Sequence, residues 1–153
     1  KAYLDSLPAV RNKAPDHDLA FPFSIRMSMI GWKLLFFDND PFKPDASKSE
    51  EWNRGAYLVN GPGHCGECHT PRNALGMMIL SQEFAGSEIV SKPINPEGLS
   101  SWTAFDFVGL LQLGMTASFD FVGGEMAEVI EHTSMLSEED QEAYAAFFIH
   151  EDD

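Results

Sequence analysis

The sequence Cys65-Gly66-Glu67-Cys68-His69 decides the fold, because it contains both cysteines of the 153-residue chain and places a histidine directly after the second one. This C-x-x-C-H spacing is the attachment signature of a c-type haem. On one helical turn, each thiol can add to a haem vinyl group and form a thioether, while His69 lies under the iron as its proximal ligand. The motif therefore predicts one covalently attached haem c, bound through Cys65 and Cys68, and a protein that transfers electrons.

Two other uses of paired cysteines fit this sequence less well. A structural zinc site needs four ligands, usually with a second Cys or His pair at short spacing. The remaining histidines form no such pair; they are His17, His64, His132 and His150. A thioredoxin-like pair would lie between a strand and a helix of an alternating β/α chain, whereas the flanking residues here indicate helices and loops. We therefore expect haem rather than a zinc or thiol module.

Helical patterns surround the motif, and no segment gives a convincing strand signal. Gly55 lies within the expected helix Glu50 to Asn60, where it costs about 1 kcal/mol relative to Ala, which suggests that another helix crosses closely there. The expected partner is Ser137 to His150, with Ser137 as its N-cap and an apolar stripe at helical spacing. Further helices are expected at residues 103–113 and 125–131. We therefore predict an all-α, cytochrome c-like domain built around the haem.

The first 48 residues differ in composition from the rest of the chain. They comprise the end of a helix at residues 2–7, an irregular polar segment at 8–22, an apolar helix at 24–37 and a linker rich in Pro and Asp at 38–49. We therefore place a domain boundary near residue 48, with residues 1–48 as an N-terminal helical and irregular extension and 49–153 as the cytochrome c domain. No apolar run reaches the roughly 18 residues that a membrane span requires.

Acidic residues dominate the C-terminal part of the chain. All ten Lys and Arg residues lie at or before Lys92, whereas residues 93–153 contain thirteen of the 24 Asp and Glu residues. The net charge of −14 argues against binding to nucleic acid or to an anionic membrane. Such a surface serves either solubility or the docking of a basic partner, and the sequence leaves both open. Because haem c is attached outside the bacterial cytoplasm, we expect a periplasmic protein.

The second axial ligand of the iron has several candidates. A thioether or an imidazole can fill this position, and the possible residues are Met77, Met78, Met115, Met126, Met135, His64 and His132. Met126 is favoured because Gly123 and Gly124 allow backbone to approach the flat ring, and because it lies far enough downstream to reach the opposite face. His132 is the alternative. An open sixth position would instead permit a haem enzyme or ligand-binding site, whereas a filled one indicates an electron carrier that is not itself an enzyme.

Several blocks of sequence together resemble a known family. They are residues 51–59 (EWNRGAYLV), 63–73 (GHCGECHTPRN), Trp102, 107–114, 126–129 (MAEV) and the final helix. This pattern resembles the last haem domain of the multihaem cytochrome c subunits of bacterial membrane-bound alcohol and sugar dehydrogenases, which are class I-like cytochromes c. The resemblance implies that His69 and Met126 are the axial pair. It also implies a dehydrogenase subunit as electron donor and an oxidase or quinone-linked acceptor in a respiratory chain.

The chain departs from the family pattern in two places. Glu125 stands where relatives usually have a proline before the methionine. This difference affects the stiffness of the loop that carries Met126. Residues 4–37 are similar to the end of a preceding haem domain and the connector after it, but the C-x-x-C-H motif of such a domain is missing. We therefore expect the C-terminal fragment of a longer cytochrome rather than a shortened relative.

Overall fold

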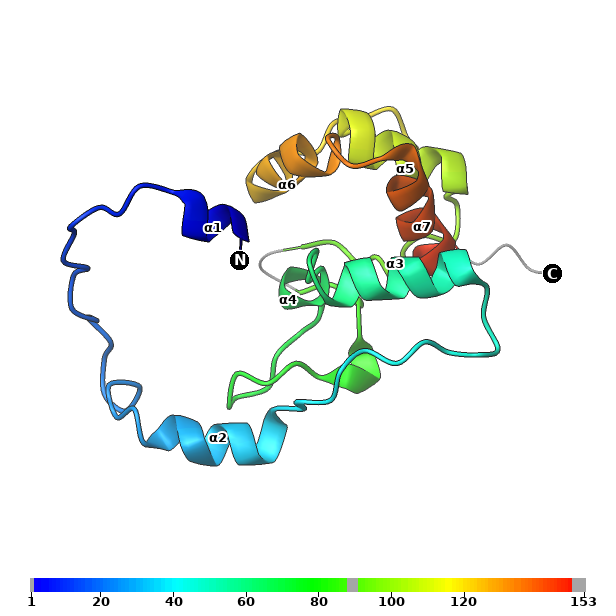
Figure 1. Ribbon diagram of the computed structural model, residues 1–153. Coiled ribbons are helices and arrows are strands. Elements are labelled where there is room, and N and C mark those ends of the chain that lie inside the picture. The colour runs from blue at the N-terminus through cyan, green and yellow to red at the C-terminus, as the bar shows by residue number, and fades with distance from the viewer. Residues whose placement is uncertain (1, 88–90, 150–153) are drawn as a thin grey trace. The chain divides into compact units, whose positions relative to one another are not determined.

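The computed structural model describes residues 2–87 and 91–149 of the chain (Figure 1). Within these ranges the regular elements are helices, and extended pairing is limited to three isolated bridges. The predicted all-α class is therefore confirmed. The chain divides into two compact units, Lys1–Asp40 and Pro41–Asp153.

The first unit holds two short helices that have no buried residue. They are α1 (Ala2–Ser6) and α2 (Ser28–Phe36). Helix α2 begins four residues after the predicted start at Ser24, because residues 20–25 form turns instead. In these turns the amide of Ser24 donates to the carbonyl of Ala20 at 3.2 Å. None of the described helices combines the length and the apolar composition that crossing a bilayer requires.

Residues 41–48 are attached to the second unit rather than forming a free linker. The ring of Phe42 packs edge-on against Tyr57, with centroids 5.7 Å apart. The amide of Asp45 donates to Oδ1 of Asn53 at 2.6 Å, and Nδ2 of Asn53 donates back to the carbonyl of Asp45 at 2.8 Å. The structural division therefore falls at residue 40, earlier than the boundary expected near 48. That the preceding residues are the tail of another domain stays a prediction.

Two crossed helices form the frame of the second unit. Helix α3 (Glu50–Asn60) is capped by Ser49, whose hydroxyl accepts from the amide of Trp52 at 3.0 Å. Helix α7 (Glu138–Phe148) is capped by Ser137. The expected crossing at Gly55 is confirmed, since this glycine lies against the backbone of α7. The predicted helix end at His150 lies outside the described residues.

Helix α7 also packs against α5 (Ala104–Leu113), and α5 packs against α6 (Glu125–Thr133), as Figure 1 shows for this unit. A capping box formed by Thr103 and Asp106 starts α5. The core between these helices is rich in aromatic rings: the ring centroid of Phe148 lies 5.1 Å from that of Phe84 and 5.2 Å from that of Phe107. This core supports the short helix α4 (Gly66–His69) that carries the C-x-x-C-H motif.

Candidate haem site

The C-x-x-C-H motif follows α3 after a short turn at residues 61–64. The amide of Cys65 donates to the carbonyl of Val59 at 3.1 Å, and the amide of His69 donates to the carbonyl of Cys65 at 3.0 Å. Both cysteines are free thiols; Cys65 is half-buried and Cys68 is exposed. Burial raises the pKa of the Cys65 thiol to about 11. The two thiols thus lie on a single helical turn, which is the arrangement that the spacing predicted.

A sharp turn between α3 and α4 is held by Tyr144 of α7. The hydroxyl of Tyr144 donates to the carbonyl of Leu58 at 3.3 Å, and burial raises the pKa of this phenol to about 12. A Cβ atom at Gly63 would overlap this hydroxyl. At the end of the turn, His64 adopts a φ of 34°, which a residue with a side chain rarely does. The crossing of α3 and α7 therefore also sets the position of the motif.

The imidazole of His69 is oriented by a backbone carbonyl. Its Nδ1 lies 2.8 Å from the carbonyl oxygen of Lys92. Because a carbonyl oxygen only accepts hydrogen bonds, Nδ1 carries the proton, and Nε2 keeps its lone pair available for a metal. Metal-ligating histidines usually have such an outer partner, which fixes the tautomer and the ring orientation. The geometry of His69 therefore fits an axial ligand of haem iron.

Residues 84–86 and Ser91 hold α4 and Thr70 through hydrogen bonds. The amide of Gly86 donates to the carbonyl of His69 at 2.8 Å, and the amide of Phe84 donates to Oγ1 of the buried Thr70 at 3.1 Å. The hydroxyl of Ser91 donates to the carbonyl of Cys68. The bonds from Gly86 and Ser91 satisfy two carbonyl groups at the end of α4, which a single helical turn leaves without partners. The motif is thus rigidly supported.

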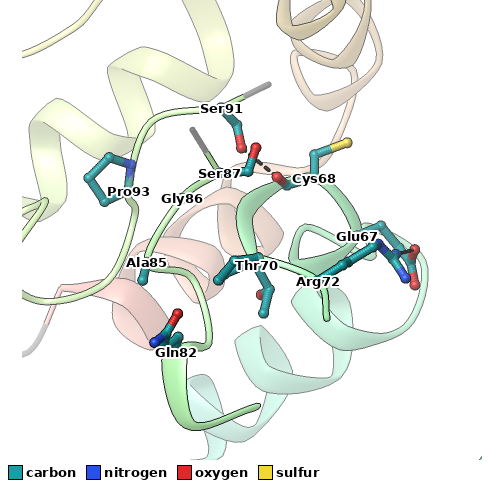
Figure 2. A pocket seen from close by; sticks show the side chains of 11 residues that line it. Glu67, Cys68, Thr70, Arg72, Gln82, Ala85, Gly86, Ser87, Ser91 and Pro93 are labelled. Atoms are coloured by element: carbon teal, nitrogen blue, oxygen red, sulfur yellow. Dashed lines mark hydrogen bonds and ion pairs between the residues drawn. The ribbon is translucent and has the colours of Figure 1, made fainter. Parts of the chain in front are cut away.

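A pocket of about 700 Å³ opens beside the motif (Figure 2). Glu67 and Arg72 meet at one end of it, and Gln82 lies at another. Cys68 borders the pocket with its sulfur turned away from Thr70 and Gln82, and neither His69 nor Met126 contributes to the lining. The pocket is therefore a hollow next to the motif that neither His69 nor Met126 borders.

Met126 lies in the first turn of α6, where it is half-buried. Gly124 caps this helix with a φ of 60°, which only glycine adopts readily. The other end of α6 is fixed by two hydrogen bonds: Oγ1 of Thr133 donates to the carbonyl of Leu111 at 3.0 Å, and Nε2 of Gln141 donates to the carbonyl of Thr133 at 2.9 Å. Met126 thus lies on a separate helix with an anchored end, and its role as the second ligand stays a prediction.

The other candidate ligands lie in different surroundings. The sulfur of Met78 packs beside the motif, 3.6 Å from a Cβ position at Gly66. Met115 pairs with Phe121 in an isolated bridge. Met135 is 72% exposed, and His132 is exposed in the last turn of α6. Within residues 2–87 and 91–149, no group of three or more His, Cys, Asp or Glu side chains gathers in the way that a metal ion requires.

Three supporting groups were not predicted from the sequence. The Lys92 carbonyl belongs to the backbone, so no side-chain pattern marks it. Arg72 pairs with Glu67, a charge pair five residues apart around the motif that could have been noticed. Gln141 is a polar residue in the otherwise apolar stripe of α7, and its 2% exposure shows that it is part of the core.

The helical unit and its motif define a c-type cytochrome, an electron-transport protein that carries haem iron. No family model matches the chain, but curated relatives do. A diheme cytochrome c-type protein of Cereibacter sphaeroides is 42% identical over 157 residues, which cover 96% of this chain and 51% of the relative. The fructose dehydrogenase cytochrome subunit of Gluconobacter japonicus is 40% identical over 127 residues, covering 78% of this chain and 26% of the relative.

The cytochrome c subunit of the quinone alcohol dehydrogenase of Gluconobacter oxydans is 36% identical over 155 residues, covering 91% of this chain and 32% of the relative. These similarities confirm the resemblance: over most of its length the chain is similar to cytochrome c subunits of bacterial dehydrogenases. It spans about half the length of the C. sphaeroides relative and a smaller share of the others.

Proposed function

We propose that this chain is an electron-relay domain with a single haem c, attached through Cys65 and Cys68 and ligated by His69 and Met126. It accepts one electron at a time from the catalytic subunit of a dehydrogenase. It passes the electron to an oxidase or a quinone-linked acceptor on the periplasmic side of the membrane. By itself the chain catalyses no reaction.

The contact between His69 and Lys92 is the observation that carries this proposal. A histidine ring fixed through Nδ1 by a carbonyl 2.8 Å away has a single orientation and one free nitrogen. The two thiols on the same turn supply the covalent attachment.

Bound haem supplies a one-electron couple of the iron, and the side chains of this chain set its properties. Lys92 holds the tautomer of His69, so that Nε2 remains the ligating atom. The soft thioether of Met126 favours ferrous iron, and the identity of the axial ligand can change haem potentials over roughly 0.8 V. The aromatic core around Phe84 and Phe148 excludes water from the inner side of the motif.

The relatives support a dehydrogenase as the electron donor. Those from G. japonicus, G. oxydans and Pantoea cypripedii are cytochrome subunits of fructose, alcohol and gluconate 2-dehydrogenases. Their names describe subunits that serve a separate catalytic partner. We extend this role to the present chain.

The covalent haem is tested by expressing the chain in a bacterial periplasm that contains the haem-attachment machinery. We expect the denatured protein to keep its colour through acid-acetone extraction and to exceed the polypeptide mass by one haem. The Cys65→Ala and Cys68→Ala variants should each yield a singly attached or poorly matured product. Complete loss of colour from the wild-type protein on extraction would overturn the assignment, and two haems per chain would contradict a single-haem relay.

Carbon monoxide distinguishes an electron carrier from a haem enzyme. If His69 and Met126 fill both axial positions, the spectrum of the reduced protein should not change when carbon monoxide is added. A changed spectrum in the wild-type protein would show an accessible iron position, and a ligand-binding or catalytic haem would then replace the relay as the best assignment.

A further inference from the structure

We propose that Arg72 is a positioning residue for the haem motif: its guanidinium ties Glu67 of α4 to the turn at residues 73–77 and offsets the charge of the Glu67 carboxylate. The inference rests on the proposed haem attachment at Cys65 and Cys68. The consequence is a haem reduction potential higher than an unpaired Glu67 would allow.

Arg72 has two partners on different segments. Its Nη2 pairs with the carboxylate of Glu67, and its Nη1 donates to the carbonyl of Gly76 at 2.6 Å. Figure 2 shows the Glu67 and Arg72 side chains meeting beside Cys68. The planar guanidinium can hold two acceptors at fixed angles, which the single ammonium group of a lysine does less well. The side chain therefore links α4 to the segment that follows it.

The turn at residues 73–77 is compact in its own right. Oδ1 of Asn73 accepts from the amides of Leu75 and Met77 at 2.9 and 3.1 Å, and the amide of Asn73 donates to the carbonyl of Met77 at 2.9 Å. Gly76 has a φ of 80°, which suits glycine. Because the turn at residues 73–77 is already ordered by its own hydrogen bonds, the bond from Arg72 to Gly76 fixes the position of the whole turn relative to α4.

Glu67 lies between the two cysteines in the sequence and on the short helix α4, so its carboxylate belongs to the segment that would hold the haem. A carboxylate there stabilises the more positive ferric iron and lowers the reduction potential. The positive guanidinium of Arg72 places a compensating charge beside the same carboxylate. The pair should therefore be nearly neutral in its effect on the iron, whereas either member alone should not be.

The electrostatic part is tested on the holoprotein by spectroelectrochemical titration. We expect Arg72→Gln to lower the reduction potential, Glu67→Gln to raise it, and the double variant to lie near the wild type. Arg54→Gln is the matched control, because it removes another arginine of a surface ion pair, with Asp140, and changes the net charge by the same amount. Equal shifts in Arg72→Gln and Arg54→Gln, or no shift in either, would overturn the compensating role.

The positioning part has a separate readout, which is hydrogen exchange of the peptide that contains the Leu75 and Met77 amides. Exchange should be faster in Arg72→Gln and in Arg72→Lys, and unchanged in Arg54→Gln. Since Arg72→Lys keeps the charge, its potential should stay closer to the wild type than that of Arg72→Gln. Unchanged exchange in both Arg72 variants would overturn the anchoring. Absence of covalent haem would refute the proposed function. The exchange measurement would still test whether Arg72 holds the turn at residues 73–77.

Discussion

Gly55 of α3 lies directly against the backbone of Ala143 in α7. A Cβ atom at Gly55 would come within 2.8 Å of the Ala143 carbonyl carbon and 2.9 Å of Cβ of Phe147, and it would overlap the Ala143 carbonyl oxygen. Neither backbone can yield without moving a whole helix. Since α3 leads into the haem motif and α7 supports the turn through Tyr144, this contact couples the fold to the site.

Replacing Gly55 by Ala should destabilise the protein. The added methyl group overpacks the crossing, which typically costs about 1–3 kcal/mol, and this should outweigh the gain of about 1 kcal/mol in helix propensity. Gly109 in α5 is the control, because a Cβ atom there meets nothing within 4 Å. Denaturant unfolding should show Gly109→Ala to be neutral or stabilising. Equal stability of the two variants would contradict the close crossing.

Sequence reasoning succeeded where the signal was local. A glycine inside a helical pattern indicated the crossing at Gly55, and Ser137 before acidic residues indicated the helix start at residue 138. The C-x-x-C-H spacing likewise indicated a helical turn, and the structure has one at Gly66–His69. In each case, the physical requirement is met by residues close together in the sequence.

It failed where the partner is distant or belongs to the backbone. The carbonyl of Lys92 contacts His69, which is 23 residues away in the sequence. Because every residue has a backbone carbonyl, no sequence pattern indicates which one will make such a contact. Residues 41–48 looked like a linker because of their Pro and Asp content, but Asn53 binds them to α3. The fixed end of α6 depends on Gln141, whose burial follows from packing and not from its side-chain type.

Gln141 should link the stability of the core to the position of Met126. Its Nε2 donates to the Thr133 carbonyl at the end of α6, and its Oε1 accepts from Nε2 of Gln112 at 2.7 Å. Gln141→Met keeps the volume but removes both hydrogen bonds, so that the Thr133 carbonyl keeps only the amide of Leu136 and the exposed Gln112 loses its partner in the core. Each lost bond should cost about 0.5–1.5 kcal/mol. We also expect a weaker iron–sulfur charge-transfer band in the oxidised holoprotein, since α6 is less firmly held.

The neighbouring exposed residue provides the comparison for this variant. Glu142→Met introduces the same side chain one position along α7, where the residue is exposed. Its stability, measured by denaturant unfolding, and its charge-transfer band should match the wild type. If Gln141→Met behaves in the same way as Glu142→Met, then Gln141 does not fix α6.

The acidic surface should affect electron transfer through its charge. Glu125, Glu128 and Glu131 lie exposed on α6, the helix that carries Met126. A cationic oxidant such as tris(phenanthroline)cobalt(III) should therefore react with the reduced protein at a rate that falls as salt rises, because the screening length shortens to about 10 Å near 0.1 M. Anionic ferricyanide should show the opposite dependence. Rates that are indifferent to salt for both reagents would favour the solubility role of these residues.

Met126 gives the most direct test of the axial ligand. Replacing it by His should lower the reduction potential substantially while the iron stays six-coordinate, because an imidazole favours ferrous iron less than a soft thioether does. Replacing it by Ala should open the position. The reduced protein should then bind carbon monoxide, and the oxidised protein should lose its iron–sulfur charge-transfer band. Optical spectroscopy with and without carbon monoxide measures both effects.

The other methionines serve as controls because a Met to Leu change roughly conserves side-chain volume. Met77→Leu, Met78→Leu, Met115→Leu and Met135→Leu should each keep the charge-transfer band and the resistance to carbon monoxide. Met78, beside Gly66, is the most stringent of these, since its sulfur already lies at the motif. If Met126→Ala keeps the band, the methionine whose loss abolishes it is the ligand. If no methionine variant abolishes it, His132 becomes the leading candidate, and His132→Ala should then make the reduced protein bind carbon monoxide.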